Sequence, residues 1–197
     1  MSSEALLGLR KPGLLFILSA PAGTGKTTLI HMLQREFPQI TPSVSFTSRA
    51  PRANEIPGQS YHFISAAEFE AKIAAEEFLE YVQLYGDYYG TSRDWVNEMR
   101  HQGKHIFLVI DTQGAQLLQG KIDAIFIFIK PPSLQELRTR LEARKTEPQA
   151  KIEERLSWAE KELEASCLYD YIVVNDNLLI AYEILRSIVI AESHRRK

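Results

Sequence analysis

The chain has 197 residues, of which 45% are hydrophobic and 24% charged, as expected for one globular domain with its own core. Its formal net charge of -2 gives no basic excess of the kind that attracts nucleic acid, so we expect no nucleic-acid partner. The single cysteine, Cys167, cannot form an internal disulfide, and no stretch approaches the roughly 18 apolar residues that cross a bilayer. These features predict a cytoplasmic protein that does not enter a membrane.

Residues 1–12 are predicted to form a short tail, and short apolar runs recur through the rest of the chain. Such runs suit strands that are buried on both faces of a parallel sheet. Helical patterns separate them, and this βαβ alternation predicts an α/β fold with a doubly wound parallel sheet. The strands are expected over residues 14–18, 105–110, 124–129 and 171–174, and the first helix over residues 29–37.

A glycine-rich loop joins the first strand to the first helix and matches the Walker A pattern GxxxxGK[ST], except that Ala20 replaces the first glycine. Gly23 and Gly25 let backbone N–H groups turn inward around a phosphate, and the helix start adds its positive dipole end. Lys26 can reach the β- and γ-phosphates, and the Thr27 hydroxyl can ligate Mg²⁺. A P-loop NTPase core is therefore predicted, with an incidental glycine-rich turn as the alternative. The residues predicted to bind ATP are Ala20, Pro21, Ala22, Gly23, Thr24, Gly25, Lys26, Thr27 and Thr28.

Residues 43–91 have a different texture, with alternating polar and apolar side chains, many aromatic residues and turn signals. This texture predicts a small inserted subdomain. Arg49 and Arg52 lie close together in it, and Tyr61 follows after a turn. Arginine binds phosphate oxygens in a bidentate, charge-assisted way, so these side chains suit a phosphate. A solvated basic loop with a core tyrosine is the alternative.

Two further helices are expected over residues 134–144 and 147–164. Arg140 and Arg144 are four positions apart and share a helix face, while Arg155 lies on the next helix. These arginines suit a site where negative charge is neutralised. Arginines paired with glutamates on the helix surface are the alternative.

Polar side chains also follow two of the expected core strands. Asp111 lies at the carboxyl end of its strand, where ligand sites of α/β sheets open, and can orient Mg²⁺ through water. It can also cap the following helix, and the two roles are compatible. Asn175 and Asp176 follow the last core strand, where a turn is the plain interpretation.

Several motifs together are similar to the guanylate kinase family in residue type, order and spacing. They are SxTxRxPRxxExxGxxYxF, FLEYVQLYGDYYGTS, LVIDTQGA, RTRLEARKT, IEERL and YIVVND, and the resemblance runs from about residue 13 to the C-terminal helix. It implies an enzyme that converts ATP and GMP to ADP and GDP with Mg²⁺. It also implies one domain of three parts: a P-loop core over about 13–44, 92–132 and 168–197, a GMP-binding insertion over about 45–91, and a helical lid over about 133–167.

The resemblance gives each candidate residue a role through its motif position. The residues that would face guanine are Ser45, Glu80 and Thr91. Those that would hold the GMP phosphate are Arg49, Arg52, Tyr61 and Tyr89, with Asp111 also on the GMP side. Those that would neutralise charge during the transfer are Lys26 and the lid arginines Arg140, Arg144 and Arg155. The pair that would border the adenine of ATP is Asn175 and Asp176.

The chemistry of guanine supports the role of Glu80 independently. Guanine presents N1–H and N2–H₂ as adjacent donors, which one ionised carboxylate can accept together, whereas adenine presents an acceptor at N1. A surface position on an edge strand is the alternative for Glu80. Val109 stands where the family has an acidic residue, which affects the detail of guanine recognition and not the reaction class.

Two other functions fit the sequence. One is a related P-loop kinase with another phosphorylated acceptor, and the other is a non-catalytic module of guanylate-kinase-like shape that binds partners. The second is disfavoured because Lys26 and Thr27 are both present in the phosphate loop. The sequence carries no signal for an oligomeric state.

Overall fold

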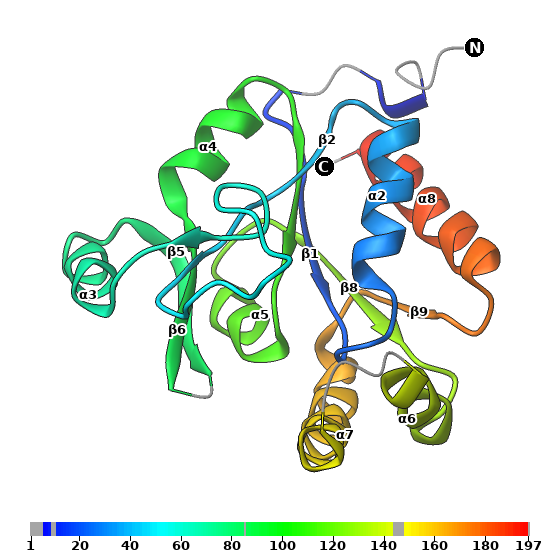
Figure 1. The fold of residues 1–197 in the computed structure, drawn as a ribbon. Coiled ribbons are helices and arrows are strands. Elements are labelled where there is room, and N and C mark those ends of the chain that lie inside the picture. The colour runs from blue at the N-terminus through cyan, green and yellow to red at the C-terminus, as the bar shows by residue number, and fades with distance from the viewer. Residues whose placement is uncertain (1–5, 9–10, 85, 144–147, 197) are drawn as a thin grey trace.

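The structure is a computed structural model that describes residues 6–8, 11–84, 86–143 and 148–196. Its core is a parallel sheet of five strands in the order β2-β7-β1-β8-β9 (Figure 1). The strands are β1 (Leu15–Ser19), β2 (Ile40–Pro42), β7 (His105–Val109), β8 (Ile125–Lys130) and β9 (Tyr171–Val174). The four predicted strands are all present with bounds within one residue of those expected, so the α/β interpretation is confirmed.

Alternate residues of the central strands point to opposite faces of the sheet, and helices cover both faces. Phe16 and Leu18 pack with α2 (Lys26–Glu36) and α8 (Leu178–His194). Ile17 packs on the other face, which is covered by α4 (Arg93–His101) and α5 (Thr112–Leu118). This period of two explains why the strands are apolar throughout, since neither face meets water.

The first helix begins at Lys26, three residues earlier than predicted. Gly25 precedes it with a φ of 92°, a left-handed conformation that glycine adopts without strain. The glycine-rich loop therefore ends where the helix starts, so that the backbone N–H groups of the first helical turn face the loop.

A second, smaller sheet comes from the segment predicted to form an insertion. Its order is β4-β3-β6-β5, and it lies at the left of Figure 1 with α3. The elements are β3 (Phe46–Thr47), β4 (His62–Phe63), α3 (Ala66–Ala74), β5 (Phe78–Leu84) and β6 (Asp87–Ser92). Phe69 of α3 stacks on Phe78 and Tyr88, with ring centroids 4.4 and 5.1 Å apart, so aromatic packing holds the helix to the strands.

Two helices follow the carboxyl end of β8 and form a unit of their own. They are α6 (Leu134–Ala143) and α7 (Gln149–Glu164), followed by a short 3₁₀ helix over Ala165–Leu168. Leu137, Leu141 and Ile152 lie in a small apolar cluster between the two helices, separate from the clusters on the main sheet. Residues 144–147, and with them Arg144, lie outside the described residues. No helix in the described ranges is long and apolar enough to cross a membrane.

Candidate active site

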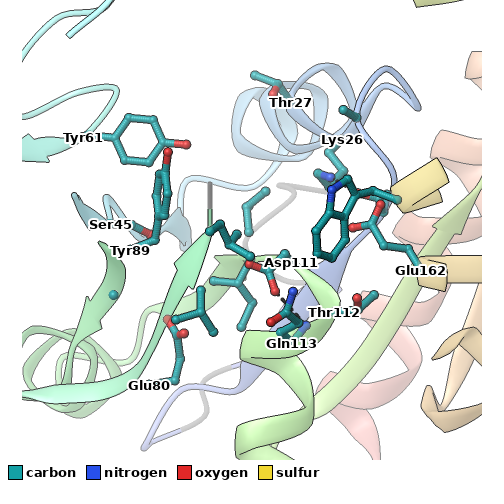
Figure 2. A pocket seen from close by; sticks show the side chains of 18 of the residues that line it. Lys26, Thr27, Ser45, Tyr61, Glu80, Tyr89, Asp111, Thr112, Gln113 and Glu162 are labelled. Atoms are coloured by element: carbon teal, nitrogen blue, oxygen red, sulfur yellow. Dashed lines mark hydrogen bonds between the residues drawn. The ribbon is translucent and has the colours of Figure 1, made fainter. Parts of the chain in front are cut away.

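A cleft of about 370 Å³ opens at the carboxyl ends of β1 and β7 (Figure 2). Four parts of the chain line it: the phosphate loop with the start of α2, the second sheet with the segment before it, the end of β7 with the start of α5, and α7. This is the place where ligand sites of open α/β sheets form, because the strand ends and the helix starts meet there. Among the predicted site residues, those that line the cleft are Ala20, Ala22, Lys26, Thr27, Ser45, Tyr61, Glu80, Tyr89, Asp111 and Arg155.

Hydrogen bonds within the phosphate loop and from Asn175 hold the loop in its conformation. The Thr24 hydroxyl donates to the Pro21 carbonyl at 2.7 Å, and the side-chain amide of Asn175 donates to the Thr24 carbonyl at 2.6 Å. Asn175 is only 4% exposed, and a Cβ on Gly25 would lie 2.7 Å from its Nδ2. Only glycine therefore fits at residue 25. Asn175 contacts the backbone of the loop, while its neighbour Asp176 is exposed.

Ala20 fits the position where the pattern expects glycine. Within the described ranges, Glu76 is the single non-glycine residue with a positive φ, so Ala20 needs no left-handed backbone. Its carbonyl accepts a hydrogen bond from Nζ of Lys26. The replacement of glycine by alanine therefore leaves the loop in a conformation that can still surround an anion.

The ammonium group of Lys26 is buried at the loop, and the carboxylates of Glu162 and Asp111 are its charged neighbours in the cleft. Burial lowers the pKa of Lys26, and the nearby cation Arg155 acts in the same direction, while Glu162 and Asp111 oppose the shift. A buried cation that is compensated only partly is suited to meeting the phosphates of a nucleotide.

Asp111 is the N-cap of α5 and also lines the cleft. Its Oδ1 accepts from the backbone N–H groups of Gln113 and Gly114 at 2.7 and 2.9 Å. Burial raises the pKa of Asp111, although both backbone hydrogen bonds and Lys26 oppose the shift. The structure therefore supports the capping role directly, and it leaves one carboxylate oxygen of Asp111 in the cleft that Lys26 and Thr27 also line.

Glu80 is a buried carboxylate, so the surface alternative is wrong. It is 6% exposed although β5 is an edge strand, and the Thr91 hydroxyl from the neighbouring strand donates to its Oε1 at 2.6 Å. Burial raises the pKa of Glu80 to about 7, Thr91 opposes this shift and Asp111 adds to it. Gly114 leaves room for this carboxylate, because a Cβ there would lie 2.8 Å from Oε2.

Tyr61 and Tyr89 line the opposite side of the cleft from Lys26, and their rings meet edge to face at 5.9 Å (Figure 2). Arg49 lies behind them, with its guanidinium carbon 5.5 Å from the centre of the Tyr61 ring. Its Nη2 donates to both oxygens of Glu55, at 2.8 and 3.0 Å, and the backbone N–H of Arg52 also donates to Glu55. Glu55 thus organises the loop that carries both arginines.

The arginines of the helical pair are placed differently from one another. Arg155 lines the cleft. Arg140 pairs with Glu136 at 2.9 Å, and its Nη1 donates to the backbone carbonyl of Asn175, also at 2.9 Å. Arg140 therefore contacts the residue that holds the phosphate loop, and it is not among the side chains that line the cleft.

Sequence reasoning missed several residues at this site. Trp158 and Glu162 of α7 line the cleft, as do Thr112 and Gln113 at the start of α5. On α7 the spacing from Arg155 is a signal, since positions three and seven residues further along share its helix face. Glu55 is the glutamate of the motif SxTxRxPRxxExxGxxYxF, but the sequence does not show that it contacts Arg49 and Arg52.

The geometry is matched by the comparisons with known proteins. The guanylate kinase family model matches residues 13–192. The chain belongs to the guanylate kinase family. It is 60% identical to the guanylate kinase of Protochlamydia amoebophila (strain UWE25) over 95% of both chains. It is 50% identical to that of Chlamydia trachomatis serovar D (strain ATCC VR-885 / DSM 19411 / UW-3/Cx), over 92% of this chain and 89% of the relative. The crystal structure of guanylate kinase from Anaplasma phagocytophilum superimposes with a TM-score of 0.77 at 31% identity, covering 95% of this chain and 90% of that one.

Family membership confirms the predicted fold class, a P-loop core built on a parallel sheet, and the enzyme class, a phosphotransferase. No observation favours a non-catalytic module or a kinase for another acceptor. The roles of individual residues stay predictions, and the burial of Glu80 allows one of them to be tested through stability.

We expect the substitution Glu80→Gln to raise the stability of the ligand-free protein at pH 8. The pKa of Glu80 is about 7 in the fold against an ordinary 4.5, so the folded state holds the proton more tightly than the unfolded state. The stability of the parent therefore falls as the pH rises from about 4.5 to about 7, and the whole loss is present at pH 8. The gain should therefore be largest above pH 7 and vanish below about pH 4.5. Urea unfolding between pH 4.5 and pH 8 measures it, with exposed Glu154→Gln as the control. A Glu80→Gln variant less stable than the parent at pH 8 would contradict the pKa assignment.

Proposed function

We propose that the chain transfers the γ-phosphoryl group of ATP to the phosphate of GMP, with the phosphate loop holding the donor and the second sheet holding the acceptor. One observation carries the proposal. Lys26 and Thr27 lie on one wall of the cleft, and Tyr61, Tyr89 and Glu80 lie on the wall that faces it. A two-substrate phosphoryl transfer needs two phosphate sites in one cleft, because the reaction depends mainly on aligned oxygens and on cations around them.

The donor binds at the loop and the first turn of α2. The backbone N–H groups there face the loop, and the positive end of the α2 dipole adds to their attraction for phosphate. Lys26 donates to the Ala20 carbonyl in the ligand-free chain and exchanges this contact for the β- and γ-phosphates. Because burial lowers its pKa, the ammonium of Lys26 gains from meeting an anion there. Asn175 and Arg140 hold the loop in place while the nucleotide binds.

The oxygen groups near the loop fit Mg²⁺. Thr27 offers a hydroxyl and Asp111 a carboxylate on the same cleft, and such hard oxygen donors are the ligands that Mg²⁺ prefers. Thr27 would hold the ion directly and Asp111 through water. The bound ion neutralises charge on the transferred phosphoryl group. Among the described residues no group of three or more His, Cys, Asp or Glu side chains could hold a metal, which agrees with an ion carried largely by the nucleotide phosphates.

The acceptor binds with its base at Glu80 and its phosphate at the arginines and tyrosines of the second sheet. Glu80 accepts N1–H and N2–H₂ of guanine while the Thr91 hydroxyl fixes one of its oxygens. Ser45, which also lines the cleft, faces the base with them. Tyr61 and Tyr89 offer hydroxyl donors. The residues that hold the GMP phosphate with these two tyrosines are Arg49 and Arg52.

The pair α6 and α7 acts as a lid over the phosphates. It has its own apolar cluster, so it can move as a unit without opening the core of the main sheet. Arg155 meets the transferred phosphoryl group from the lid. Arg140 and Arg144 complete the cationic shell on closure, when Arg140 exchanges its contact with the Asn175 carbonyl for the phosphates. No general base is required, because the GMP phosphate is already anionic at neutral pH. The reaction belongs in the cytoplasm, where the lone exposed Cys167 stays reduced.

A panel of nucleoside monophosphates tests the acceptor assignment. With ATP and Mg²⁺ we expect kcat/KM for GMP to exceed that for AMP by on the order of 10⁴, because AMP leaves the buried Glu80 carboxylate without donors. Coupled assays of ADP formation measure it, and Glu80→Gln should lose most of the preference. AMP or CMP used as well as GMP would refute the role of Glu80 and favour another acceptor.

Substitution of the loop lysine tests the donor assignment. Lys26→Ala should lower kcat by at least about 100-fold, because the charge that develops between donor and acceptor loses a fixed cation. The exposed lysine Lys151 of α7 serves as the matched control, since Lys151→Ala removes the same charge without facing the cleft. Near-normal turnover by a folded Lys26→Ala variant would show that the loop does not act on the transferred group.

A further inference from the structure

Among the charged residues that line the cleft, Glu162 is the one to which the proposed reaction gives no role. It lies near the end of α7, in the proposed lid, and lines the same cleft as Lys26, Thr27 and Asp111. Figure 2 shows its side chain on the lid side of the cleft, close to Lys26. A carboxylate on the moving part of the molecule thus faces the place where the phosphates and Mg²⁺ are proposed to bind.

Within the described ranges no group donates a hydrogen bond to the Glu162 carboxylate, and its electrostatic neighbours are Lys26 and Asp111. Burial raises the pKa of Glu162, while Lys26 opposes the shift and Asp111 adds to it. Both carboxylates therefore act on the ammonium group of Lys26, and Arg155 is the other cation among the described residues that line the cleft. A half-buried charge with so few partners is costly to keep unless something in the working enzyme compensates it.

Nucleotide binding changes this balance. Once Lys26 moves to the β- and γ-phosphates, it no longer compensates Glu162 and Asp111 alone, and the polyphosphate adds several negative charges. A closed lid would then press Glu162 toward anions in a cleft that excludes water, where repulsion is strong. A divalent cation bound with the phosphates removes this repulsion, since it supplies the missing positive charge.

We propose that Glu162 is a positioning residue that makes lid closure depend on the metal: it opposes closure over metal-free ATP and permits closure over MgATP. The inference rests on the proposed function only in taking ATP and Mg²⁺ as ligands of the phosphate loop. Its benefit to the reaction is that the lid closes when the nucleotide carries the ion needed for transfer.

Trp158 provides a direct readout of closure. It lies one helical turn before Glu162 and lines the cleft, so its fluorescence responds when α7 moves. The chain has two tryptophans, and Trp95→Phe leaves Trp158 as the single reporter. The experiment titrates this background with a non-hydrolysable ATP analogue, in excess EDTA and in excess Mg²⁺, and compares the signal change and the Kd.

In the background we expect weaker binding and little signal change without the metal. In the Glu162→Gln variant the lid should close over the metal-free analogue as well. The ratio of the Kd in EDTA to the Kd in Mg²⁺ should therefore fall at least about fivefold. Glu160→Gln, an exposed carboxylate two positions away on the same helix, removes the same charge and should leave the ratio unchanged. Glu162→Asp keeps the charge and should keep the metal dependence.

A folded Glu162→Gln variant with the metal dependence of the background would overturn the inference. An equal loss of that dependence in Glu160→Gln would do so too, because it would mean that net charge and not position matters. Loss of the metal dependence in Glu162→Asp counts against it as well, and this variant also guards against a fold that does not tolerate the amide. This titration contains no GMP and does not depend on the transfer reaction. If a separate activity assay found no GDP, the proposed reaction would be refuted while this inference would still stand or fall by the titration.

Discussion

The hydrogen bond from the side chain of Asn175 to the carbonyl of Thr24, at 2.6 Å, is the contact on which the site depends. It ties the end of β9 to the phosphate loop, and Arg140 ties α6 to the backbone of the same asparagine. One buried residue, through its side chain and its backbone carbonyl, therefore joins the sheet edge, the loop and the helical pair. The close approach is compatible only with glycine at residue 25, so the Walker A pattern is enforced by packing as well as by phosphate binding.

The cleft contains buried ionisable side chains, whose charged forms lower the stability of the fold but favour the binding of a ligand. Lys26, Asp111, Glu162 and Glu80 are all shifted in pKa by burial, each toward its neutral form. Such groups gain most when a ligand supplies the missing opposite charge or hydrogen bonds. In the proposed reaction, guanine would supply hydrogen-bond donors to Glu80, and the phosphates would supply negative charge to Lys26. The wall with Lys26 is therefore suited to the phosphoryl donor, and the wall with Glu80 is suited to the acceptor.

The sequence was sufficient for four of the five core strands and for the phosphate loop, because period-two burial and glycine-rich turns are local signals. It missed β2, which has only three residues. It placed the start of α2 too late, since the helix begins directly at Lys26. The acceptor residues came from motif resemblance, because their convergence depends on how a separate sheet is oriented. Glu162, Gly114 and the role of Asn175 were missed for the same reason: they act through contacts between segments that are far apart in the chain.

A crystal structure with GMP and a non-hydrolysable MgATP analogue tests the central claim, that one cleft brings two phosphate sites together. We expect Lys26 to leave the Ala20 carbonyl for the β- and γ-phosphates. We also expect the GMP phosphate to contact Arg49 and Tyr61 while guanine pairs with Glu80. A GMP phosphate bound away from the γ-phosphate, or a guanine with no contact to Glu80, would contradict it.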